Sequence, residues 1–576
     1  MPTPRRPLQP LPTTNEDREP DGSTLRDRLA QRMKKPQRHR LLQGFPAVPA
    51  MSHAVPPTDD LQAGATPQIR TALRREGRVR RLDGALVDTA FALARDRLAQ
   101  GRPAPLPLDP DTPQRRALRA QVEQRQDEAE AHWKRTVARG DRSTPPLFSV
   151  DATRDLIIGI IPHTQCVPAK EGCGFCTFPH DAANPRARRD MLESVLSEIE
   201  HHGQSDLLRG RRVHALYIGG GTANLSDPAE IAMLVHAVGK GFQLDEAELS
   251  LEGTPHLFER LLSSHLKNLA AQKTQTQRIS IGVQTFDEGF LRQMGRQAFG
   301  SVSTVKKLVK KARSLSIATS ADLLFNLPGQ TAAQMDHDLD QALSCDLDQI
   351  CLYNLVLYEG LGTPWSKQPA LVQAMRSSDE ACGSWLHLRE RLLQEGYVQT
   401  TLTNFERADV APGPARFRYE LASFSPERTD GLGIGPLGLS TFVNPREGRG
   451  LKLLRRKSLA GTPWSREDLL FEYDAQTLPL LFFTRSLAKT RIDGALWPSS
   501  FGVRLTDAFA EPLAACVEAG LVEPHPHDIV LSPAGMFYAD AVVATFIDGF
   551  RSDGAGIHTA DLLRERPQAS EYISMG

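Results

Sequence analysis

The sequence predicts an α/β fold, in which a complete or partial βα barrel is preceded by a mostly helical extension and followed by a small winged-helix-like domain. Its length of 576 residues leaves room for about three or four domains. From about residue 150, short β-rich runs alternate with amphipathic helical stretches, which is the pattern of a parallel sheet with crossover helices. The segments on either side of this region lack the alternation.

The N-terminal part divides into two segments. Residues 1–65 are rich in Pro, Arg, Gln and Thr and poor in aliphatic side chains, so we expect them to be disordered. Residues 66–149 carry loosely helical apolar spacing and form the predicted helical extension. Basic side chains exceed acidic ones by nine in residues 1–150, although the whole chain carries 69 of each. Because these basic residues are scattered, we interpret the excess as a solvated tail and expect no nucleic-acid partner.

Residues 150–400 form the predicted barrel. The expected strands are 156–161, 213–220, 249–253, 278–284, 318–325 and 349–357. The expected helices are 190–201, 228–238, 256–270, 287–295, 302–314, 331–343 and 379–395. In such barrels the functional residues lie at the C-terminal ends of the strands.

The C-terminal part has a different texture. Residues 401–463 form a predicted connecting segment. Residues 464–550 are predicted to be mostly helical, with two short strands within VEPHPHDIVLS, and residues 551–576 form a predicted tail. No run approaches the roughly 18 apolar residues of a spanning helix. The basic N-terminus lacks a following apolar stretch, so we expect a cytoplasmic protein with no signal peptide and no membrane partner.

Three of the seven cysteines fall within eleven residues, directly after the first predicted strand. The spacing is Cys166-x6-Cys173-x2-Cys176. An odd cysteine total without a secretion signal favours a metal or redox site over a disulfide framework. Three thiolates could hold a [4Fe–4S] cluster and leave one iron open. A zinc site completed by His163 or His180, or a chance cluster, remains an alternative at this point.

Polar or glycine residues follow the next four predicted strands as well. Three glycines at a strand end allow a ligand to approach the backbone closely, and strand alternation puts Ser280, Gly282 and Gln284 on one face. Each feature alone could be structural, but their succession at consecutive strand ends indicates a ligand site. The residues concerned are Gly219, Gly220, Gly221, Thr222, Glu252, Ser280, Gln284 and Asp322.

The ordered motifs resemble the radical S-adenosylmethionine (SAM) superfamily, in the branch typified by oxygen-independent coproporphyrinogen III oxidase. The resemblance spans roughly residues 150–550. It is carried by the cysteine triplet, YIGGGTANLS, LEGTP, ISIGVQTFDEGFLRQMGR, DLLFNLPGQT, YNLVLYEGLGTPW, GYVQTTLTNFER and DGLGIGPLGLS. Two features depart from the family pattern: the first cysteine gap is six residues instead of three, and GIIPHTQC replaces the HIPFC approach.

The resemblance implies a barrel of radical SAM type with a [4Fe–4S] cluster and one or two SAM molecules. Cys166, Cys173 and Cys176 would ligate the cluster and form the catalytic centre. Phe175 would lie near the adenine, and Glu252 would hold the amino or ribose groups of SAM. The methionine end of SAM would be lined by Gly219, Gly220, Gly221 and Thr222. The ribose would be contacted by Ser280, Gln284 and Asp322.

The implied function is reductive cleavage of SAM to a 5′-deoxyadenosyl radical that takes hydrogen from an organic substrate. The first interpretation is a coproporphyrinogen-oxidase-like oxidative decarboxylation of porphyrinogen propionates. The alternatives are a methyltransferase or cyclopropanase that uses a second SAM as carbon donor, and a haem-binding chaperone-like relative. The expected partners are a small-molecule substrate and a one-electron donor such as flavodoxin or ferredoxin.

Overall fold

A computed structural model describes residues 151–543, apart from 168–172, 179, 261, 360, 446–447 and several stretches between 456 and 541. The predicted disordered segment 1–65, the helical extension 66–149 and the tail 551–576 lie outside the described residues. In the described part, no helix is both long and apolar enough to cross a membrane.

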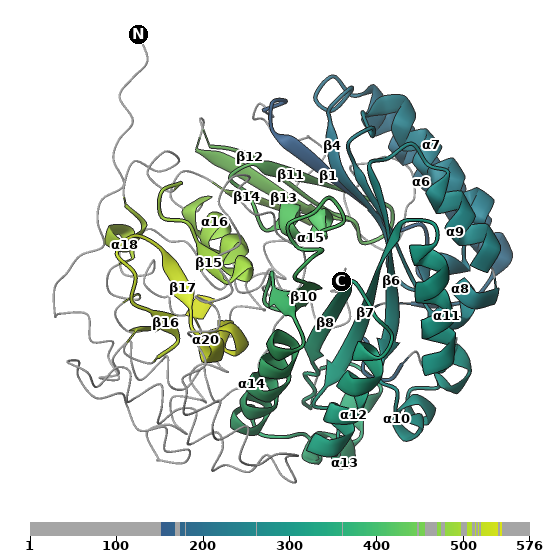
Figure 1. Cartoon of the computed structure of the whole chain (residues 1–576). Helices are drawn as coiled ribbons and strands as arrows, with labels where there is room; N and C mark the ends of the chain where they lie inside the picture. Colours follow the sequence, from purple (N-terminus) through teal and green to yellow (C-terminus); the bar gives the residue numbers. More distant parts are fainter. Residues whose placement is uncertain are drawn as a thin grey trace.

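Six parallel strands form the centre of a twelve-stranded sheet (Figure 1). They follow chain order from one strand to the next, and β11 (Thr429–Ile434) pairs in parallel with the first of them. The outermost strands of the sheet do not pair with each other, so the barrel is partial. The six strands are β1 (Asp155–Ile160), β4 (Val213–Ile218), β5 (Glu248–Gly253), β6 (Thr276–Gln284), β7 (Ile317–Phe325) and β8 (Gln349–Asn354).

Amphipathic helices cover the outer face of these strands (Figure 1). Several begin at strong capping signals: Asp227 and Glu230 form a capping box at the start of α7, as do Thr331 and Gln334 at α12. The helices between the strands are α6 (Pro185–Gln204), α7 (Pro228–Gly241), α8 (Pro255–Arg260), α9 (Leu262–Ala270), α10 (Glu288–Gln293), α11 (Val302–Arg313), α12 (Ala332–Leu343), α13 (Pro369–Gln373) and α14 (Ser378–Gln394).

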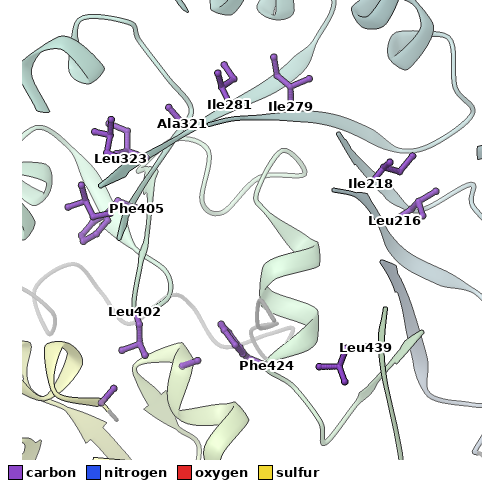
Figure 2. Packing of buried hydrophobic residues seen from close by; sticks show 14 of the residues in the cluster. Leu216, Ile218, Ile279, Ile281, Ala321, Leu323, Leu402, Phe405, Phe424 and Leu439 are labelled. Carbon is purple, nitrogen blue, oxygen red and sulfur yellow. The ribbon is translucent and has the colours of Figure 1, made fainter. Parts of the chain in front are cut away.

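The two faces of the barrel strands have opposite chemistry because successive side chains in a strand alternate. Figure 2 shows apolar side chains of this sheet, including Ile279, Ile281, Ala321 and Leu323, which belong to one continuous buried core. Full burial of such a side chain stabilises the fold by about 1.5–3 kcal/mol. The residues between them are polar and also buried, and they face the barrel interior: Glu248, Ser250, Arg278, Ser280, Ser320, Asp322 and Gln349.

A short helix, α15 (Arg418–Ser423), lies inside the open barrel (Figure 1). It contacts β1, β4 and β5. Tyr419 stacks on Tyr217 with ring centroids 4.9 Å apart, and the backbone N–H of Arg418 donates to Glu248 at the first residue of β5. The helix therefore fills the interior: Arg418 meets the N-terminal end of β5, and the Tyr419 ring reaches Tyr217 near the C-terminal end of β4.

Antiparallel strands extend both sides of the sheet. On one side β10 (Asn404–Arg407) pairs with β8, and β9 (Tyr397–Gln399) pairs with β10. On the other side β12 (Leu439–Asn444), β13 (Arg449–Leu454) and β14 (Leu469–Tyr473) follow β11. The predicted connecting segment 401–463 thus supplies strands to both sides, and the boundary at 463 stays a prediction.

The C-terminal region contains a three-stranded sheet in the order β15-β17-β16, and the last two strands coincide with the predicted two-strand hint. Its elements are α16 (Leu478–Ser486), β15 (Arg491–Ile492), α18 (Leu505–Ala508), β16 (Val522–Glu523), β17 (Ile529–Leu531) and α20 (Pro533–Phe537). Trp385 of α14 donates its indole N–H to the Pro533 carbonyl at 3.2 Å, which joins this region to the barrel.

Candidate active site

The cysteine loop follows β1 and returns to the barrel through a small parallel ladder. Gln165 and Cys166 form β2, which pairs with β3 (Asp181–Ala182). Burial and then the neighbouring Cys173 thiol raise the pKa of Cys166 to about 11. Burial and then the thiols of Cys173 and Cys166 raise the pKa of Cys176 to about 12. The three predicted ligands are therefore gathered in one poorly hydrated place, where a thiolate requires a positively charged partner.

Cys166 is held against the end of β4. Its Sγ lies 3.2 Å from the Thr222 hydroxyl oxygen, which also accepts the backbone N–H of Val167 at 3.1 Å. The Thr222 N–H in turn donates to the Gln165 carbonyl at 3.0 Å. Gly221 has a φ of 51°, and a Cβ there would lie 2.6 Å from that same carbonyl oxygen. The close approach of the loop to β4 thus requires glycine at this position.

Glu252, at the end of β5, faces the glycine run. Its Oε2 accepts the N–H of Gly220 at 3.1 Å and the Tyr217 hydroxyl at 3.4 Å. A Cβ on Gly219 would lie only 2.5 Å from the same oxygen. Burial and then the nearby Asp322 raise the pKa of Glu252 to about 8. The structure therefore brings the predicted carboxylate and the predicted glycines together.

Asp322 and Ser280 lie deeper in the interior. Ser280 of β6 is aligned with Glu252 on one side and Ser320 on the other. Asp322 is 6% exposed, and burial raises its pKa to about 6. Its Oδ1 has no hydrogen-bond partner within the protein. A buried carboxylate oxygen left without a protein partner indicates a place for a ligand or an ordered water.

Gln284 sits just beyond a break in the strand. The register of β6 against β7 shifts between Gly282 and Gln284, and Gln284 has a φ of 72°. The strict alternation that the sequence predicts therefore ends before this residue. Its side-chain nitrogen would nevertheless lie 3.4 Å from a Cβ added at Gly282. Gln284 therefore stays beside Gly282, on the face of β6 that we expect to contact the ligand.

Arg296 is a site residue that the sequence analysis missed. Its Nη1 lies 3.2 Å from the Cys173 Sγ, and its Nη2 donates to the Gly282 carbonyl. The side chain is buried, and its guanidinium lies 4.4 Å from the centroid of the Phe299 ring. It joins the cysteine loop to the end of β6. Its only sequence signal was an arginine shortly after the strand, within the motif ISIGVQTFDEGFLRQMGR.

Trp365 clamps the loop from another side. It lies in the short helix η4 (Trp365–Lys367), and its backbone N–H donates to the Gly174 carbonyl at 3.0 Å. Gly174 has a φ of 80°, and a Cβ there would lie 2.0 Å from the indole nitrogen. Phe175 meets the Trp365 ring edge-on, with centroids 5.7 Å apart. The expected contact of Phe175 with adenine stays a prediction.

Cys176 is covered by apolar side chains from the β1 end and the β11–β12 turn. Its Sγ accepts the N–H of Phe178 at 3.4 Å, and it packs with Ile161, Phe178 and Leu437. Leu437 holds a φ of 64°, which is uncommon for a branched residue. Such strain is often kept where a local arrangement serves a site.

The donor set suits an anionic, sulfur-rich group. Each sulfur has at least one hydrogen-bonding neighbour: Thr222 at Cys166, Arg296 at Cys173 and the Phe178 N–H at Cys176. Hydrogen bonds to the sulfurs are one means by which proteins tune iron–sulfur clusters. In the part of the chain that the structure describes, no three His, Cys, Asp or Glu side chains are grouped as ligands of a single metal ion. The fit to a [4Fe–4S] cluster rests on the chemistry of the donor set, which is three cysteine sulfurs that approach one another from a single loop.

Comparison with known proteins identifies the domain. Residues 169–342 match the model of the radical SAM superfamily, a span that includes Cys173, Cys176, Glu252 and Asp322. The chain contains a radical SAM domain. Among solved structures, the fold of this radical SAM protein is similar to that of coproporphyrinogen III oxidase (HemN) from Escherichia coli, with a TM-score of 0.55 and 22% identity over 69% of this chain and 91% of HemN.

Curated relatives carry several different names. Radical S-adenosyl methionine domain-containing protein 1, mitochondrial, from Danio rerio is 28% identical over 51% of this chain and 63% of its own length. Anaerobilin synthase from Escherichia coli O157:H7 is 30% identical over 32% of this chain and 40% of its own length. Heme chaperone HemW from Bacillus subtilis is 25% identical over 65% of this chain and 96% of its own length. The matches thus span less than two thirds of the first two relatives.

Proposed function

We propose that this radical SAM protein cleaves SAM reductively at a [4Fe–4S] cluster held by Cys166, Cys173 and Cys176. The observation that carries the proposal is the joining of the cysteine loop to two strand ends, through Thr222 to β4 and through Arg296 to β6. When bound, such a cluster supplies one electron for cleavage of SAM to methionine and a 5′-deoxyadenosyl radical, which removes hydrogen from the substrate.

The residues around the loop would bind and orient SAM. The glycine run lets a ligand approach the backbone of Gly219–Gly221, and Thr222 borders the same space. Glu252 and Asp322 would accept hydrogen bonds from the ammonium or the ribose hydroxyls, because each has a carboxylate at the interior face of a strand. Ser280 and Gln284 would complete the ribose contacts, and Phe175 would lie at the adenine.

For the substrate we propose a tetrapyrrole. The support is in the printed names of the similar proteins: the solved structure is a coproporphyrinogen III oxidase, and the Bacillus relative is a heme chaperone. In the first form of the proposal, a porphyrinogen propionate gives a hydrogen atom to the 5′-deoxyadenosyl radical, which becomes 5′-deoxyadenosine. The substrate radical then loses its carboxylate as carbon dioxide and gives one electron to an external one-electron acceptor, which leaves a vinyl group. A low-potential one-electron donor of the flavodoxin or ferredoxin class would reduce the cluster.

A second candidate is haem binding without porphyrinogen chemistry. One observation favours it: the match to HemW of Bacillus subtilis covers 96% of that protein, whereas the match to anaerobilin synthase covers 40%. The two candidates share the cluster and the SAM site and differ in the fate of the tetrapyrrole.

Product analysis separates the candidates. The protein is purified and reconstituted without air, and incubated with SAM, dithionite and either coproporphyrinogen III or haem. We expect 5′-deoxyadenosine by mass spectrometry, and decarboxylated porphyrinogen under the first candidate. Tight haem binding with unchanged porphyrinogen would support the second. C176A is the control, and cleavage of SAM by this variant at the wild-type rate would contradict the cluster assignment.

A further inference from the structure

A small apolar cluster, separate from the main core, covers one side of the cysteine loop. It consists of Ile161 just after β1, Phe178 and Leu437, which are all buried, and the partly buried Cys176 packs against it. A Cβ on Gly220 would lie 3.0 Å from Ile161 and 3.3 Å from Phe178. The apolar cluster therefore borders both a predicted metal ligand and the glycine run.

Leu437 occupies this place in an unfavourable backbone conformation. It lies in the turn between β11 and β12 and has a φ of 64°, a region that glycine or asparagine enters more easily than a branched residue. It is nevertheless 8% exposed, so its side chain is packed rather than free in solvent. Strained residues persist where the surrounding structure determines them, and they cluster at functional sites. The place of Leu437 beside Cys176 therefore calls for a functional explanation.

The turn that carries Leu437 is held at both of its ends. The N–H of Gly435 donates to Glu198 of α6 at 3.1 Å, and the same carboxyl group forms a buried ion pair with Arg455. The N–H of Arg455 donates to the Gly438 carbonyl at 2.8 Å. A Cβ on Gly435 would also lie 2.1 Å from a carbonyl oxygen at the end of β1. These contacts fix the turn, and with it the place of Leu437.

We propose that Leu437 is an apolar shield that keeps water from the Cys176 side of the bound cluster and thereby holds its reduction potential low. This inference rests on the proposed function, because it assumes the [4Fe–4S] cluster. A reduced cluster carries one more negative charge, which poorly hydrated apolar surroundings disfavour, and solvent access is one of the properties that set the potential of such clusters. A low potential favours transfer of an electron to SAM, so the shield assists the reductive cleavage.

Arg296 has the opposite influence at a different cysteine. Its Nη1 lies 3.2 Å from the Cys173 Sγ, and its positive charge favours the more negative, reduced cluster. The loop thus has a charged, hydrogen-bonding neighbour at Cys173 and an apolar neighbour at Cys176. Because Arg296 is unchanged in every variant of Leu437, a shift in potential that such a variant produces reports on the apolar side.

The test is a redox titration of the anaerobically reconstituted protein, followed by electron paramagnetic resonance of the reduced cluster. L437N and L437G both suit a positive φ, so they remove the apolar cover without adding backbone strain. Each should shift the midpoint potential to a more positive value than that of the wild type. Each should also release iron to a chelator about 10-fold faster. L437M, which keeps an apolar side chain of similar volume, should retain the wild-type potential.

L451A is the matched control. Leu451 of β13 is buried in the main core, two strands away from β11 in the sheet, so its truncation should lower the melting temperature and leave the potential unchanged. Equal potentials for wild type, L437N and L437G would overturn the inference, and so would an equal shift in L451A. A wild type that binds no iron and sulfide would overturn the proposed function instead.

Discussion

At the residue scale, the glycines at the end of β4 decide how closely the cysteine loop approaches the sheet. Gly221 combines a positive φ with a Cβ position 2.6 Å from the Gln165 carbonyl oxygen. Gly210 has a similar φ of 72°, but nothing lies within 4 Å of its Cβ position. A comparison of alanine substitutions at Gly221 and Gly210 therefore distinguishes the effect of backbone strain, which both share, from the effect of a steric clash, which only Gly221 has.

G221A should therefore be worse than G210A. Both substitutions carry the strain of a positive φ, about 1–2 kcal/mol, and only G221A also pushes the segment before Cys166 away from Thr222. We expect G221A to retain much less iron after anaerobic reconstitution, while G210A retains the wild-type amount. Equal iron content in the two variants would contradict the role given to the Gln165–Gly221 approach.

Glu252 predicts a pH dependence of stability in the SAM-free protein. Its pKa is raised from 4.5 to about 8 in the fold, so the folded chain keeps a proton that the unfolded chain releases between these values. The free energy of unfolding should therefore fall as pH rises through this window. Glu406, with its pKa raised to about 7 by burial, contributes in the same direction.

E252Q should reduce this fall, because glutamine does not titrate. The measurement is the melting temperature of wild type and E252Q across that pH window, with E193Q at an exposed position of α6 as the control. E193Q should follow the wild type. A melting temperature for E252Q that falls as steeply as that of the wild type would show that Glu252 does not hold the proton.

Single residues also mark the limit of what the sequence could predict. Cys166, Cys173 and Cys176 were predicted because three thiols lie within eleven residues, and Glu252 was predicted because it belongs to a succession of polar or glycine residues at consecutive strand ends. Arg296 was not predicted, since its role depends on how the segment after α10 folds back onto Cys173, and an isolated arginine carries no such signal.

At the element scale, the cysteine loop is held by segments that are distant in sequence. Trp365 of η4 fills the space over Gly174, and Leu437 of the β11–β12 turn packs beside Cys176. This arrangement predicts that the clamp determines how well the loop retains its metal.

W365A tests the clamp. Removing a buried tryptophan costs about 3–5 kcal/mol, and here it should also speed the release of iron to a chelator. W385A is the matched control, because Trp385 is equally buried but packs against Phe325 and Phe405, away from the cysteine loop. It should lower the melting temperature without changing iron release. Equal release rates for W365A and W385A would mean that Trp365 serves stability alone.

The barrel elements themselves were predictable. Short β-rich runs between amphipathic helical stretches predicted all six central strands, and each one begins and ends within about three residues of its expected position. By contrast, α15 was not predicted, because a six-residue helix inside a barrel has no amphipathic repeat long enough to detect. The register shift before Gln284 was not predicted either, since a single inserted residue leaves no periodic signal in the sequence.

At the scale of the whole molecule, one end of the barrel carries the cysteine loop and the groups that we propose for SAM, and α15 fills the interior. Buried polar side chains of β5, β6 and β7 line this interior. The fold and the superfamily follow from these features, whereas the tetrapyrrole proposal relies on the names of similar proteins. The sequence could predict the fold and the superfamily because their motifs stand at successive strand ends. It could not predict the substrate, because no single motif identifies one.

The central claim is that three thiols hold a [4Fe–4S] cluster that cleaves SAM. The most direct measurement is iron and acid-labile sulfide content of the anaerobically reconstituted protein, followed by 5′-deoxyadenosine release with SAM and dithionite. We predict about four irons and four sulfides per chain, with 5′-deoxyadenosine released by wild type and not by C176A. A colourless protein without sulfide, or one that holds a single zinc ion, would contradict the account.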